Sequence, residues 1–98
     1  MPFKVALSDD AQADFACLDA RWRSAICDAV EAHLRHEPQR TSKSRIKRLQ
    51  DSDHPQYRLR VDSMRVFYDI EGDHVQILGI VAKEQAAEWL KRFTDDTP

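Results

Sequence analysis

Apolar and polar residues alternate strictly from residue 57 to residue 61, where the sequence reads Tyr-Arg-Leu-Arg-Val. Successive side chains of a strand point to opposite faces, so the tyrosine, leucine and valine share one face and Arg58 and Arg60 share the other. The dipeptide Asp62-Ser63 then interrupts the pattern, and alternation resumes from residue 64 to residue 70. The two segments predict a β-hairpin with a short turn.

The same patterns predict the remaining elements. Alternation predicts a strand over residues 3–7, and Ser8 is a suitable N-cap for the helix that follows. Apolar residues at helical spacing predict an antiparallel pair of helices that ends near Pro38. Further predicted elements are a short basic edge strand or irregular segment at 44–49, an apolar central strand covered on both faces at 75–82, and a helix over 83–93. The predicted order is β-α-α-β-β-β-β-α.

Length and composition indicate a single folded domain. A chain of 98 residues is long enough for one modest core and too short for two, so residues 1–98 are expected to form one domain. No apolar run approaches the roughly 20 residues of a membrane span, and the N-terminus lacks the apolar segment of a signal peptide. Cys17 and Cys27 have no CxxC spacing and are expected to be reduced, partly buried thiols. These features predict a cytoplasmic protein that does not associate with a membrane.

Charge is segregated along the chain, although the net charge is only −2. Residues 40–65 hold eight basic and three acidic residues, whereas the segments on either side are both acidic. Arg58 and Arg60 share one strand face, and Arg65 lies on the partner strand of the predicted hairpin. Crowded guanidinium groups repel one another unless an anion lies between them. The middle segment therefore favours a local site for an anion such as phosphate.

Structural roles for these arginines stay open at this point. Arg58 and Arg60 would also be compatible with a solvent-exposed strand face that pairs with nearby acids. For Arg65 the competing role is a salt bridge with Asp69 or Asp62. The sequence alone does not decide between these roles and an anion site.

The chain resembles the RelE/ParE toxins, which are the toxin halves of bacterial type II toxin–antitoxin pairs. The resemblance rests on Tyr-Arg-Leu-Arg-Val at 57–61, Arg-Val-Phe-Tyr-Asp-Ile at 65–70 and Val-x-Ile-Leu at 75–78, and it extends over about residues 3–92. It implies an α+β fold in which an antiparallel β-sheet carries an N-terminal helical hairpin and a C-terminal helix. It also implies a cognate antitoxin protein as partner, and neither a metal nor another cofactor.

RelE-like toxins cleave messenger RNA on the ribosome, and the resemblance assigns this chemistry to a few positions. Attack of a ribose 2′-OH on the adjacent phosphate needs a base, cations that stabilise the phosphorane, and an acid for the leaving oxygen. RelE itself has lysines where this chain has Arg58 and Arg60, and a guanidinium is a poor proton acceptor. Lys83 is therefore the leading acid/base candidate, with His54 and Glu84 as weaker ones. The positions that the resemblance implies as catalytic are Arg58, Arg60, Arg65 and Lys83.

Substrate contacts are expected from a second group of residues. Trp89 falls where RelE-like sequences have a tyrosine, and it offers a stacking surface and an N–H donor but no phenol. Its competing role is core packing, because it shares a helical stripe with Leu90 and Phe93. A basic run before the hairpin is expected to contact the RNA backbone, or else to form a solvated face: Lys43, Arg45, Lys47 and Arg48.

Two other functions stay open within the same superfamily. A ParE-like protein binds DNA gyrase and inhibits it without chemistry of its own, which agrees with the missing tyrosine. A catalytically silent homologue would act only together with its antitoxin, as a transcriptional corepressor. The sequence therefore predicts a toxin-like domain whose target is ribosome-bound mRNA or, alternatively, DNA gyrase.

Overall fold

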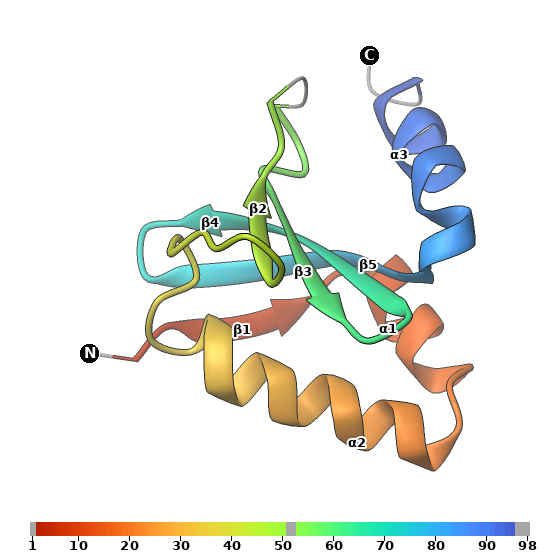
Figure 1. The fold of residues 1–98 in the computed structure, drawn as a ribbon, viewed down its shortest axis with the longest axis horizontal. Helices are drawn as coiled ribbons and strands as arrows, with labels where there is room; N and C mark the ends of the chain where they lie inside the picture. Colours follow the sequence, from red (N-terminus) through yellow and green to blue (C-terminus); the bar gives the residue numbers. More distant parts are fainter. Residues whose placement is uncertain (1, 51–52, 96–98) are drawn as a thin grey trace.

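A five-stranded sheet forms the centre of the computed structural model, which describes residues 2–50 and 53–95 (Figure 1). The spatial order is β1-β5-β4-β3-β2. The strands are β1 (Lys4–Leu7), β2 (Ile46–Arg48), β3 (Tyr57–Val61), β4 (Met64–Glu71) and β5 (His74–Ala82). Strands β2 to β5 pair antiparallel, as expected, whereas β1 pairs parallel with β5. The α+β class and the order of elements are confirmed, with this one parallel pair as the departure.

The helical hairpin is confirmed, with boundaries slightly shifted. Its helices are α1 (Asp9–Ala16) and α2 (Ala20–Ala29), and α2 continues as the π-helical segment η1 (Val30–Leu34). The Ser8 hydroxyl accepts a hydrogen bond from the Ala11 amide and caps α1. Asp19 caps α2 by accepting a bond from the Trp22 amide, so the link between the helices is residues 17–19.

Residues 83–95 form the last helical segment. It begins as the 3₁₀ turn η2 (Lys83–Gln85) and continues as α3 (Ala86–Asp95). No helix in the described part of the chain is long and apolar enough to cross a membrane. Both cysteines, Cys17 and Cys27, are free and exposed, so the expectation that they are partly buried is wrong. Cys17 follows the last residue of α1, and Cys27 lies within α2.

The main core lies between α2 and one face of the sheet, which we call the inner face. Leu59, Val66 and Tyr68 of the sheet are fully buried there together with Ile26 and Leu34. The Tyr68 hydroxyl donates a 2.6 Å hydrogen bond to the Pro38 carbonyl. Burial raises the pKa of this phenol, with a smaller contribution from Tyr57. Tyr68 is thus a core residue whose hydroxyl has a hydrogen-bond partner.

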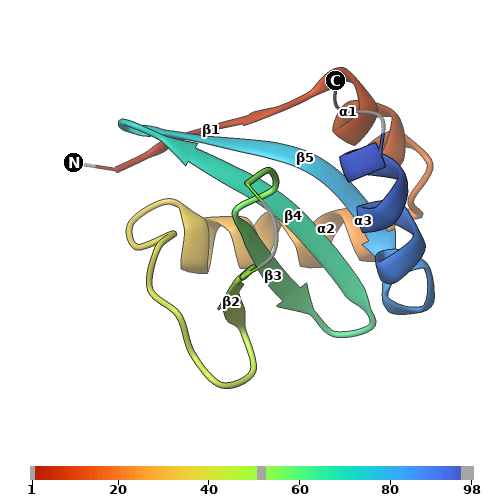
Figure 2. The same ribbon diagram turned by 90° about the horizontal axis from the view of Figure 1, so that it is seen from above.

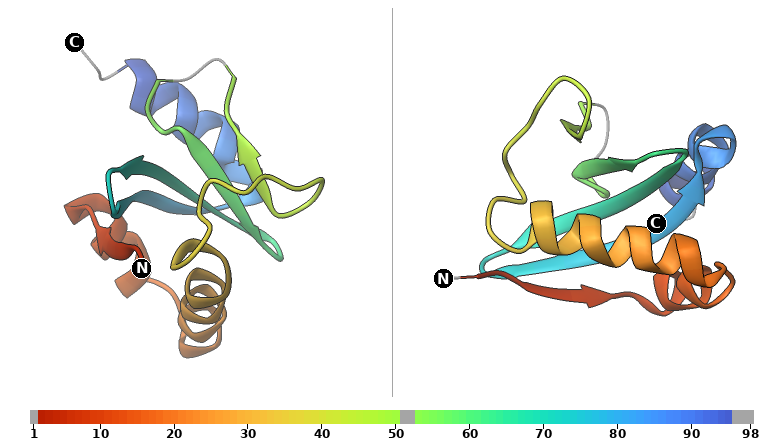
Figure 3. Two further views of the ribbon diagram at one scale, coloured as in Figure 1. Left: turned by 90° about the vertical axis from the view of Figure 1, so that its left-hand side faces the viewer. Right: turned by 60° about the horizontal axis from the view of Figure 1, so that its bottom comes forward.

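The opposite, outer face of the sheet is covered only in part. Helix α2 runs beneath the sheet in Figure 1, whereas α3 and the segment that leads into β3 rise on the other side. Figure 2, seen from above, shows α3 over the end of β5 and β2 at the far edge of the sheet. The two views of Figure 3 show the same separation of α2 from α3. The outer face between α3 and β2 is where the predicted site residues gather.

Candidate anion-binding site

Strand register brings the three arginines of the hairpin together on the outer face. Arg60 lies directly opposite Arg65 in the β3–β4 pair, and Arg58 lies opposite Phe67. Residues that face each other across a sheet point to the same side, and residues two apart on one strand do so as well. Arg58, Arg60 and Arg65 therefore occupy two neighbouring rows of one face. The sequence predicted this grouping.

The positive charge of this cluster is not compensated within the described residues. No carboxylate between residues 2 and 50 or 53 and 95 forms an ion pair with Arg58, Arg60 or Arg65. The Arg58 Nε is buried and has no hydrogen-bond partner among the described residues. Burial lowers the pKa of the Arg58 guanidinium, and the charges of Arg65 and Arg60 lower it further. A half-buried cation that is opposed by two others is a site that an anion would stabilise.

Arg65 is held by the backbone of the hairpin turn. Its Nη1 donates 2.9 Å hydrogen bonds to the carbonyls of Asp62 and Met64. Asp62 itself has a φ of 54°, a left-handed conformation that aspartate tolerates better than most residues. The expected alternative, a salt bridge from Arg65 to Asp62 or Asp69, is not formed. The turn instead fixes the direction of a guanidinium whose other N–H groups remain available.

An aromatic wall from α3 borders the arginine cluster. The Trp89 ring stacks on Phe67 at a centroid distance of 4.7 Å and on Phe93 at 5.0 Å. It lies directly over Gly79, where a Cβ atom would overlap the indole ring. Phe67 and Gly79 belong to the same row of the outer face as Arg58. Packing is therefore an established role of Trp89, which places α3 beside the arginines.

Lys83 is exposed at the end of the same sheet, at the start of η2. Its amide donates a 2.9 Å hydrogen bond to the Ser63 carbonyl, which ties the end of β5 to the β3–β4 turn. Lys83 comes two residues after Val81, and Val81 lies opposite Arg65 in the β4–β5 pair. Lys83 thus lies next to the row formed by Arg60 and Arg65. Glu84, one of the two weaker acid/base candidates, also lies on η2 and is exposed.

The basic run before the hairpin is divided between the two faces. Lys47 lies opposite Arg58 and therefore shares the outer face. Arg45 and Arg60 line a cavity of about 290 Å³ together with Ser44 and Asp62. Lys43 is exposed on the loop that precedes β2.

Arg48 lies elsewhere. It is opposite Tyr57, whose ring packs on the inner face against Tyr68. The Arg48 guanidinium lies 5.1 Å from the centroid of the Tyr57 ring and donates a bond to the Gln56 carbonyl. Arg48 therefore lies outside the cluster that contains Arg58.

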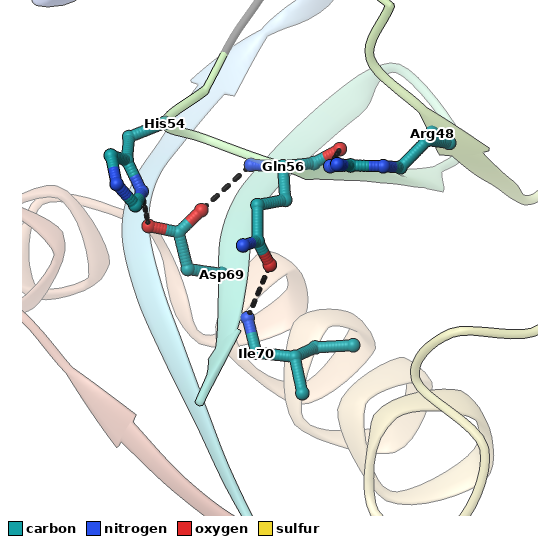
Figure 4. Close-up of polar contacts among 5 residues, drawn as sticks. All are labelled: Arg48, His54, Gln56, Asp69 and Ile70. Atoms are coloured by element: carbon teal, nitrogen blue, oxygen red, sulfur yellow. Dashed lines mark hydrogen bonds and ion pairs between the residues drawn. The ribbon is translucent and has the colours of Figure 1, made fainter. Parts of the chain in front are cut away.

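A polar network at one end of the outer face is not part of the sequence prediction. Asp69, whose side chain is only 10% exposed, pairs through Oδ2 with the His54 Nδ1 at 2.6 Å (Figure 4). Its Oδ1 accepts a 2.7 Å hydrogen bond from the Gln56 amide. From the sequence, His54 is only a weaker acid/base candidate, and Asp69 is a possible salt-bridge partner of Arg65. A buried acid next to a loop histidine is recognisable only once the register of β4 is known.

Similarity searches link the chain to known proteins through structure alone. No family model matches the chain, and no curated protein matches it. A RelBE toxin–antitoxin complex from Mycobacterium tuberculosis contains a chain with a TM-score of 0.71 and 24% identity, covering 84% of this chain and 99% of that one. An archaeal RelE–RelB complex from Pyrococcus horikoshii gives a TM-score of 0.69 and 19% identity, with 85% and 97% covered.

A third similar structure comes from the RelB–RelE antitoxin–toxin complex of Methanococcus jannaschii. It gives a TM-score of 0.64 at 17% identity, and the match covers 85% of this chain and 95% of the other. The neighbours are the RelE toxins of these complexes. The chain therefore has the fold of RelE toxins, as the resemblance in the sequence predicts.

Proposed function

We propose that this protein is the toxin of a type II toxin–antitoxin pair and acts as a ribosome-dependent endoribonuclease on messenger RNA. The observation that carries the proposal is the arginine cluster of the outer face. Arg58 is half-buried, and no described carboxylate neutralises it or its two neighbours. A fold retains such repulsion at a cost, which a phosphate bound between the guanidinium groups would offset.

The geometry suggests a division of labour among the basic residues. Arg58, Arg60 and Arg65 would grip the scissile phosphate and stabilise the charge that develops on it during attack. Lys83 would protonate the leaving oxygen from the edge of the cluster. Lys47, Arg45 and Lys43 would contact neighbouring phosphates of the same strand. Trp89 would hold α3 in place and border the site.

Growth arrest on expression tests these roles. Arg60→Ala combined with Arg65→Ala should abolish the arrest and leave the fold intact. A matched control is Arg21→Ala combined with Arg40→Ala, which removes the same charge from exposed positions outside the cluster. Circular dichroism establishes that each protein is folded. A folded Arg60/Arg65 double variant that still arrests growth would show that the site is assigned wrongly.

Inhibition of DNA gyrase is the second candidate function. It is favoured by Trp89, which stands where the family has a tyrosine, has no phenol for proton transfer, and stacks on Phe67 and Phe93. Pulse labelling of protein and DNA synthesis shortly after induction separates the two functions. Early loss of amino-acid incorporation supports the ribonuclease, and early loss of thymidine incorporation supports gyrase. A chain that arrests neither process acts only as a corepressor.

An antitoxin is the partner that follows from either proposal. The three similar structures are toxin–antitoxin complexes, which supports a partner of that kind here. Acidic residues of such a partner would complement the arginine cluster, so the affinity of the complex should fall as salt is raised. An affinity that does not change with salt would remove the electrostatic part of this proposal.

A further inference from the structure

His54 is held by a buried carboxylate at the edge of the outer face. Its Nδ1 lies 2.6 Å from Asp69 Oδ2, and its side chain is 55% exposed, so the ring is fixed on one side and open to solvent on the other (Figure 4). Gln56 completes the arrangement: its amide donates to Asp69 Oδ1 at 2.7 Å, and its Oε1 accepts from the Ile70 amide at 3.0 Å. Both carboxylate oxygens of Asp69 are thus used to position the loop that carries His54.

The network lies on the same face as the arginines. Along β4, Arg65, Phe67 and Asp69 are two residues apart in succession, whereas Val66 and Tyr68 between them belong to the inner core. The row that contains Asp69 is therefore next to the row that contains Phe67 and Arg58. Neighbouring rows on one face are about 7 Å apart. An imidazole at this edge is within reach of a nucleotide whose phosphate is bound by Arg58.

The pairing also sets the chemistry of the ring. A carboxylate on Nδ1 favours the tautomer that carries its proton there and leaves Nε2 free to accept one. It also stabilises the imidazolium that forms after proton transfer. The three arginines cannot accept a proton, and Lys83 has the role of the acid in the proposed function, so the reaction still needs a base. These properties identify His54 as the group that the arginine cluster lacks.

We infer that His54 is the general base of the proposed ribonuclease and that Asp69 is the residue that positions it. The inference rests on the proposed function. His54 Nε2 takes the proton of the ribose 2′-OH while the 2′-oxygen forms a bond to phosphorus. The bond from phosphorus to the 5′-oxygen breaks, and Lys83 gives that oxygen a proton, which it then regains from the solvent. The products are a 2′,3′-cyclic phosphate and a 5′-hydroxyl end, and the His54 imidazolium then returns its proton to the solvent.

A second histidine in the chain provides a matched control. His74 Nδ1 lies 2.7 Å from Asp73 Oδ1, and its side chain is 56% exposed, almost the same as that of His54. Asp73, however, is 70% exposed and belongs to the β4–β5 turn, outside the arginine rows. A histidine–aspartate pair by itself is therefore present in both places. Only the pair that contains His54 combines a buried carboxylate with the arginine face.

The test measures single-turnover cleavage of ribosome-bound mRNA by the purified chain as a function of pH. The wild-type rate should rise with pH, as expected for a reaction that requires a deprotonated base. His54→Gln should lower the rate by about 100- to 10,000-fold and remove this rise, with little effect on RNA binding. Asp69→Asn should shift the pH profile, and added imidazole should partly restore His54→Ala. His74→Gln should match the wild type in rate and in pH profile.

The outcomes separate this inference from the proposed function. Cleavage by His54→Gln at close to the wild-type rate, with the same pH profile, overturns the role of His54 and leaves the ribonuclease in place. A second outcome also overturns the role of His54. In it, His54→Gln loses cleavage, imidazole does not restore His54→Ala, and Asp69→Asn leaves the pH profile unchanged. The network then has only a structural role. Absence of cleavage by the wild-type chain overturns both proposals.

Discussion

Replacing Arg58 by methionine should make the protein more stable while it disables the proposed site. Methionine keeps an unbranched side chain of similar length against Phe67 but removes the charge and the buried, unpartnered Nε. Relief of repulsion from the neighbouring arginines contributes about 0.2–1 kcal/mol. Removal of an unsatisfied buried donor contributes about 1 kcal/mol more. We therefore expect a gain of about 1–2 kcal/mol in the free energy of unfolding.

Urea denaturation at low and high salt measures this gain. For a domain of this size, about 1 kcal/mol corresponds to a rise in Tm of roughly 4–8 °C. The difference between variant and wild type should shrink as salt is raised, because screening weakens the repulsion in the wild type. Added phosphate should raise the Tm of the wild type more than that of Arg58→Met, since only the wild type has the complete site. A variant that is less stable than wild type at low salt would refute the view that Arg58 is uncompensated.

Two further predictions concern packing. Tyr68→Phe leaves the Pro38 carbonyl without its hydrogen bond and should lower the free energy of unfolding by about 1–3 kcal/mol, measured by urea denaturation. Tyr57→Phe is the control. It should cost little, because the Tyr57 hydroxyl forms no hydrogen bond within the described residues. A Tyr68→Phe protein as stable as wild type would contradict this. Gly79→Ala should displace the Trp89 ring and cost about 1–3 kcal/mol, with a change in the fluorescence of Trp89 measured in a Trp22→Phe background. Unchanged fluorescence would show that the ring does not depend on the glycine.

Local sequence patterns predict the hairpin and the helices because the determining interactions are short-range. Alternation in residues 57–61 fixes which side chains share a face, and Ser8 and Asp19 mark the starts of α1 and α2 by capping. The order of elements follows from the same signals. Local patterns do not predict the parallel pairing of β1 with β5, because it joins residues about 70 positions apart in the sequence.

The site is predictable to the extent that it depends on the hairpin. Arg58, Arg60 and Arg65 are grouped by alternation and by the short turn between their strands, both of which the sequence contains. The opposite placement of Lys47 and Arg48 depends on the register of β2, which pairs with β3 through a long connection. His54 belongs to the connection between β2 and β3, so its contact with Asp69 of β4 depends on the path of that connection. Contacts of this kind are set by tertiary packing, so sequence patterns alone do not identify them.

The state of Asp69 explains why the arginine cluster is left without a counter-charge. Asp69 lies on the outer face, one row from Arg58, and is the acid that would be best placed to neutralise it. Both of its oxygens are instead taken by His54 and by the Gln56 amide. These two bonds hold the carboxylate against the loop, and among the described residues it forms no ion pair with an arginine. The loop before β3 therefore has two effects: it presents a histidine at the edge of the outer face, and it engages an acid that could otherwise compete with a phosphate for Arg58.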